Sequence, residues 1–166
     1  MANEYRLEHD VLTKVWRRNL DPDTTLFATA AGTNGLSVVS GTLDVVRGEW
    51  VQLNSSNKAI RSAVGDLCAG AMPVWSGGEG RFDAVGGITA VWGPHVAKTS
   101  QFDPAGVYAP GTELTVELSS SKTRLKVAAS GNYVVALVEQ APSGASVAFP
   151  DGLLQVSSHG AGYFKA

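Results

Sequence analysis

The histidines are the residues best suited to acid–base chemistry. The chain has three of them, at positions 9, 95 and 159. His95 follows Trp92-Gly93-Pro94 and could serve as a general base, although this setting favours a histidine in a turn. Ser158 precedes His159, but neighbours in sequence do not make a catalytic triad, and no Gly-x-Ser-x-Gly motif presents a nucleophile. We therefore expect that the protein is not an enzyme.

Metal and phosphate sites are not predicted either. The single cysteine, Cys68, excludes an intrachain disulfide and a Cys-rich zinc site, and its small apolar neighbours predict a buried thiol. Asp21-Pro22-Asp23 lacks the pattern of a calcium loop and is interpreted as a solvated turn. The glycine-rich stretch 76–80 lacks the Gly-Lys-Ser/Thr ending of a phosphate loop. We predict no cofactor and no metal.

Aromatic residues gather in the middle third of the chain. They are Trp75, Phe82, Trp92, Phe102 and Tyr108. Such side chains fill β cores and anchor protein interfaces, and exposed rings can also stack on sugars. A carbohydrate-binding or receptor-binding β module therefore stays open as an alternative function.

Composition limits the partners. Charged residues make up 17% of the chain and the formal net charge is −2. A nucleic-acid binder would carry a basic stripe, whereas the lysines and arginines here are scattered apart from the cluster 14–18. No apolar run approaches the ~20 residues of a membrane helix, and no apolar signal segment follows Met1. We expect synthesis in the cytoplasm, and neither a nucleic-acid nor a membrane partner.

The pattern of apolar residues divides the chain in two. In residues 1–35, apolar side chains recur about every fourth position from Leu7 to Trp16, which predicts a short helix on an N-terminal arm. The small residues 28–35 predict a linker or an extended crossing. From residue 36 onward the period is two, as in 112–118 and 124–127, and turn residues separate the segments. Further strands are expected at 36–40, 43–46, 49–53, 58–63, 67–75, 81–85, 88–92, 133–139, 145–149 and 153–157.

Residues 36–166 are thus predicted to form an all-β domain, a small β-barrel or β-sandwich of about ten short strands. An internal near-repeat supports this. The stretch 48–75 and the stretch 111–138 each consist of a strand, a serine turn, a second strand, a small-residue corner with glycine, and an apolar third strand. Two such units could close into one barrel, which would leave no unpaired edges.

The second unit resembles the small β-barrel type of tailed-bacteriophage head decoration (cement) protein. The resemblance rests on Tyr108-Ala109-Pro110-Gly111, the strand 114–118, Lys122, the strand 124–129, Ser130-Gly131 and the apolar strand 133–138. It covers about residues 36–157 as a loose pattern. It implies a structural capsid protein of the virion, bound as a homotrimer to the outer surface of the expanded head and stabilising the major capsid protein beneath it.

The contact residues that we predict come from the arm and from one turn. In the arm they are Tyr5, Leu7, Val11, Trp16 and Arg17, and in the turn they are Trp92 and His95. Aromatic and arginine side chains carry much of the binding energy of protein interfaces.

Overall fold

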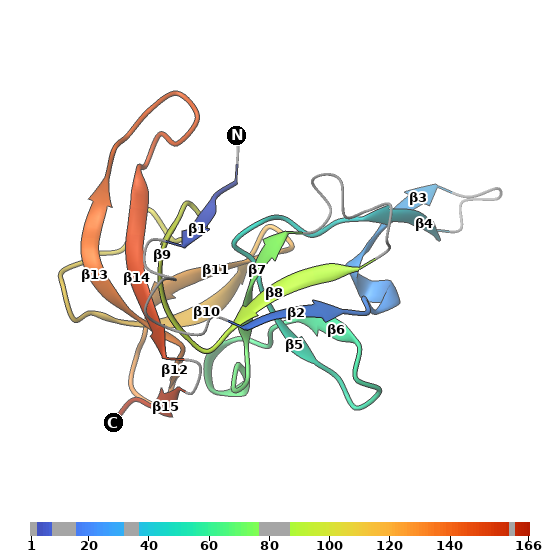
Figure 1. Ribbon diagram of the computed structural model, residues 1–166, viewed down its shortest axis with the longest axis horizontal. Coiled ribbons are helices and arrows are strands. Elements are labelled where there is room, and N and C mark those ends of the chain that lie inside the picture. Colours follow the sequence, from blue (N-terminus) through green and yellow to red (C-terminus); the bar gives the residue numbers. More distant parts are fainter. Residues whose placement is uncertain (1–2, 8–15, 32–36, 77–86, 160–161) are drawn as a thin grey trace.

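The computed structural model describes residues 3–7, 16–31, 37–76, 87–159 and 162–166. Nearly all of the regular structure is β, in strongly curled sheets, which confirms the predicted all-β class (Figure 1).

A six-stranded sheet has the order β1 (Tyr5–Leu7), β9 (Pro94–Thr99), β14 (Leu153–His159), β13 (Ala136–Ser143), β10 (Glu113–Ser119), β11 (Lys122–Val127). A five-stranded sheet has the order β2 (Trp16–Leu20), β8 (Ile88–Trp92), β7 (Met72–Ser76), β5 (Trp50–Leu53), β6 (Ala59–Arg61).

Smaller elements complete the fold. One two-stranded sheet pairs β3 (Phe27–Ala31) with β4 (Ser37–Leu43), and another pairs β12 (Tyr133–Val134) with β15 (Tyr163–Phe164). Single 3₁₀ turns lie at Thr24–Leu26 and Gly65–Leu67. The described residues form more strands than the ten expected, because several strands have only two or three residues.

The β10–β11 hairpin follows directly from its sequence. Leu114 and Val116 are buried, Glu117 is half-buried, and the register pairs Ser119 with Lys122. The two-residue turn at Ser120 and Ser121 has positive φ at both positions, 49° and 66°. This is the backbone that a tight hairpin requires to match the twist of its strands.

The near-repeat is matched by a repeated topology. In the first unit the central strand β5 pairs antiparallel with β6 on one side and β7 on the other. In the second unit β10 pairs in the same way with β11 and β13. The units lie in different sheets, however, and so do not close together into a single hydrogen-bonded barrel.

Strand β5 lies between two hydrophobic cores. Trp50 is 1% exposed and belongs to the core of the six-stranded sheet, with Leu114 and Leu125. Its neighbour Val51 is fully buried in the core of the five-stranded sheet, with Ile88. Successive side chains of a strand point to opposite faces, so one strand serves both cores.

The N-terminal helix prediction is wrong for the residues at its two ends. Leu7 closes β1, which pairs with β9, and Trp16 opens β2, which pairs with β8. Residues 8–15 lie outside the described residues. An isolated helix of this length is marginal in water, whereas β1 and β2 each gain backbone hydrogen bonds to one neighbouring strand, β9 and β8. The division into an arm (1–35) and a domain (36–166) stays a prediction.

Three strand assignments also differ from expectation. The stretch 28–35, predicted as a linker or an extended crossing, contains most of β3, and Pro94 and His95, interpreted as part of a turn, begin β9. Proline is tolerated there because it is the first residue of the strand. Residues 145–149 are not a strand but the loop between β13 and β14, and the strand expected at 81–85 lies outside the described residues.

Candidate functional site

Tyr5 and His95, both predicted as contact residues, bond to each other inside the protein. The Tyr5 hydroxyl lies 2.7 Å from His95 Nε2, and the two side chains are 1% and 4% exposed. His95 Nδ1 lies 2.8 Å from the Gly93 carbonyl, an acceptor, so Nδ1 carries a proton and donates. In the neutral ring Nε2 then accepts, and Tyr5 donates to it. Burial lowers the pKa of His95, an effect partly offset by the bond to Gly93, and burial raises the pKa of Tyr5.

The other predicted contact residues are placed less completely. Trp92 ends β8, is 46% exposed and lies opposite Trp16 in the register. The structure places the backbones of Leu7, Trp16 and Arg17 in β1 and β2, and their side chains are outside the described part. Val11 lies wholly outside it. Of the predicted contacts whose side chains are described, Trp92 is therefore the one that presents surface.

A protruding hairpin offers the clearest exposed apolar surface, and the sequence analysis missed it. The loop between β13 and β14 extends away from the sheets, at the same end of the molecule as the N-terminus (Figure 1). From Gln140 to Pro150 the chain contains no charged residue, and Val147 is 100% exposed. The apolar and small residues 145–149 predict a strand, although the Pro, Ser and Gly residues in and around this stretch are the usual signs of a loop.

The tip of this hairpin has a defined shape. Ser146 N–H donates to the Phe149 carbonyl at 3.0 Å, and Phe149 N–H donates back to Ser146 Oγ at 3.1 Å. Gly152 N–H donates to the same Phe149 carbonyl at 2.9 Å. An apolar tip that is already ordered loses little conformational entropy when it docks.

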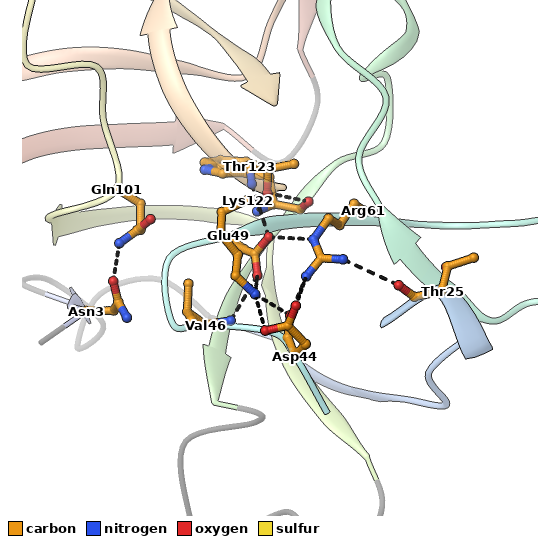
Figure 2. A network of polar contacts seen from close by, with 10 residues as sticks. Asn3, Thr25, Asp44, Val46, Glu49, Arg61, Gln101, Lys122 and Thr123 are labelled. Carbon is orange, nitrogen blue, oxygen red and sulfur yellow. Dashed lines mark hydrogen bonds and ion pairs between the residues drawn. The ribbon is translucent and has the colours of Figure 1, made fainter. Parts of the chain in front are cut away.

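A completely buried carboxylate, Glu49, takes part in a network of polar contacts (Figure 2). Its Oε1 accepts from Arg61 Nε at 2.9 Å and from the Thr123 N–H at 3.0 Å. Its Oε2 accepts from the Val46 N–H at 2.9 Å, with Lys122 Nζ 4.0 Å away.

Asp44 joins the same network from the surface. Lys122 Nζ donates to Asp44 Oδ1 at 2.6 Å, and Arg61 Nη2 donates to the Asp44 carbonyl. Every oxygen of Glu49 is thus occupied by donors of the chain, and they come from both repeat units. This arrangement suits a structural clamp between the sheets.

The remaining candidates are also engaged in structure. Cys68 is buried as predicted, with Sγ 2.9 Å from the Gly65 carbonyl. Asp23 caps the 3₁₀ turn Thr24–Leu26, and the Thr25 N–H is the main cause of its lowered pKa. Among the described residues, no group of three or more His, Cys, Asp and Glu side chains could hold a metal. Within that same part of the chain, no helix is long and apolar enough to cross a membrane.

Comparisons with known proteins give no relative. No family model, no curated protein and no solved structure matches the chain.

Proposed function

We propose that the protein is a non-enzymatic structural protein that decorates the outside of a tailed-phage head and stabilises it by bridging neighbouring major capsid subunits. The observation that carries this proposal is the ordered, charge-free β13–β14 hairpin tip with its fully exposed Val147. Ordered apolar surface that is left uncovered in a single chain is a sign of a protein partner.

The N-terminal segment lies beside the hairpin, at the end of the molecule that we propose to dock on the capsid. Asn3 lines a small hollow together with Phe149 and Pro150 of the hairpin. Tyr5 and His95 are buried, so their part in docking is indirect: they hold β1 against β9 and so fix where the N-terminus emerges. Leu7, Val11, Trp16, Arg17 and Trp92 stay proposed contacts.

Cement proteins stabilise a shell because their binding is coupled to its assembled state. A protein that binds only the assembled, expanded shell lowers the free energy of that state and of no other. Self-association as a homotrimer would multiply weak contacts from each copy, because docking of the second and third tips becomes intramolecular. No cofactor is needed for this role.

The alternative, a carbohydrate-binding or receptor-binding module of a tail or fibre, predicts a row of exposed aromatic rings. Phe102 and Tyr108 are instead 5% and 7% exposed and pack edge to face at 5.5 Å. These rings belong to the core, which favours the decoration role over a multi-ring sugar platform.

The test is cosedimentation of the full chain with purified heads of the phage that carries its gene. We expect saturable binding to expanded heads and little binding to unexpanded ones. Light scattering should give the mass of a trimer, either for the free protein or for the copies bound to the shell. Absence of binding to expanded heads would overturn the proposal.

A further inference from the structure

A shallow hollow opens beside Trp92 on the five-stranded sheet. Its volume is about 280 Å³, and its lining comes from four adjacent strands and one turn. Arg18 lies on β2, Trp92 on β8, Met72 on β7, Gln52 and Leu53 on β5, and the turn is Ala69-Gly70. The hollow lies where β5 and β8 end and β7 begins.

Trp92 and Arg18 are neighbours on one face of the sheet. The register pairs Trp92 with Trp16 and Ala90 with Arg18, which makes Trp92 and Arg18 a diagonal pair. Trp92 is 46% exposed and therefore presents part of its indole to the hollow. Within the described residues, the Arg18 guanidinium has no hydrogen bond or ion pair.

Gln52 also lines the hollow, and its side-chain amide is held in place. Its Oε1 accepts from Ser62 Oγ and from the Ala63 N–H, both at 3.2 Å. The lining thus combines an aromatic surface and one cation, and it includes no carboxylate.

We propose that this hollow binds one anionic sugar residue, a hexuronate at the end of or within a glycan. The apolar face of the ring would lie on Trp92, and its carboxylate would pair with Arg18. The volume is at the lower limit of ligand pockets, which run from ~300 Å³ upward, and suits one ring rather than a long chain. Arg18 is the single charge of the lining, so charge complementarity selects an acid.

The hollow and the hairpin tip share no residue, and Trp92 is the one proposed capsid contact that also lines the hollow. The test is an NMR titration of the ¹⁵N-labelled full chain with trigalacturonate, with the neutral galactotriose as the comparison ligand. We expect saturable shifts that include the Trp92 indole N–H, the Gln52 side-chain amide and the Arg18 backbone amide, and these shifts occur only with the uronate.

Two variants and one control sharpen the test. Trp92→Ala should weaken uronate binding about tenfold or more, and Arg18→Gln should remove the preference for the acid over the neutral sugar. Tyr163→Ala is the matched control, since Tyr163 is also 46% exposed but lies on β15, and it should bind as the parent does.

Three results would overturn the inference: no saturable shifts at millimolar uronate, shifts that map away from the hollow, or equal affinity for the neutral sugar. Binding of adenosine monophosphate at the hollow without binding of trigalacturonate would also overturn it, in favour of a nucleotide. Each of these results leaves the head-binding experiment unaffected.

Discussion

Thr123 and Glu49 join the two repeat units of the fold: the Thr123 N–H donates to Glu49 Oε1 at 3.0 Å. The Thr123 hydroxyl also bonds the backbone of Trp50, the residue after Glu49. It accepts from the Trp50 N–H at 2.7 Å and donates to the Trp50 carbonyl at 3.1 Å. One threonine at the start of β11 thus anchors the start of β5, the strand that serves both cores. Contacts at this junction should therefore control the stability of the whole molecule.

Glu49→Gln should destabilise the protein strongly. The change leaves Arg61 and Lys122 without the buried charge that they face, and it places an NH₂ group against N–H donors. Breaking a buried charge network costs on the order of 3–5 kcal/mol of unfolding free energy. Chemical denaturation measures this loss.

Glu117→Gln is the control for that experiment. Glu117 pairs with Arg124 and Lys126 at the surface, with a side chain that is 21% exposed. Such pairs contribute about 1 kcal/mol or less. An equal loss of stability in the two variants would show that Glu49 has no special role at the junction.

Thr123→Val should cost about 1–3 kcal/mol, because the Trp50 N–H then becomes a buried donor without a partner while the shape of the side chain is kept. Thr123→Ser keeps the hydroxyl and should recover most of the loss. If valine and serine behave alike in denaturation, the hydroxyl bond to Trp50 does not hold the sheets together.

The Tyr5–His95 pair should make stability fall as the pH falls below the ordinary histidine pKa of 6.5. Burial lowers the pKa of His95 in the folded protein, so the unfolded chain binds more protons in this window and unfolding is favoured. Protonation would also turn Nε2 into a donor and end its role as acceptor for Tyr5.

Unfolding free energies of the parent and of His95→Gln, measured between pH 7 and pH 5, test this expectation. The parent should lose more stability over this range than the variant, since the other titrating groups are common to both. Parallel curves would contradict the proposed effect of burial on His95.

Val147→Asp should weaken binding to expanded heads with no loss of folding stability, because Val147 is wholly exposed in the free chain. Burial of a valine contributes ~1.5–3 kcal/mol, so the affinity per site should fall about tenfold or more. Val107→Asp is the matched control: Val107 is 85% exposed in a different loop. Equal cosedimentation of the two variants would exclude the hairpin tip as the docking element.

The sequence predicted the strands whose alternation is strong, such as β10 and β11, and it predicted the repeated three-strand unit. It did not predict β3, whose residues Phe27–Ala31 are mostly small and have weak strand propensity, so that pairing with β4 decides their conformation. The two ends of the helix expected from Leu7 to Trp16 lie in strands for a related reason, since partner strands outweigh a short amphipathic pattern there.

The candidate sites were harder to foresee. Glu49 stands 12 residues before Arg61 and more than 70 before Thr123, and only the folded chain brings the three together. Trp92 was singled out from its residue type, but the hollow beside it needs side chains from three other strands and a turn. Local patterns carry no information on such long-range neighbours.

The central claim, that the protein cements a phage head, is tested most directly by the temperature at which expanded heads open. Heads stripped of this protein would be heated with and without the full chain, and release of their DNA followed by dye fluorescence. The account predicts a higher opening temperature when the protein is added in saturating amounts, and a smaller shift with Val147→Asp at the same concentration. An unchanged opening temperature at saturation would contradict it.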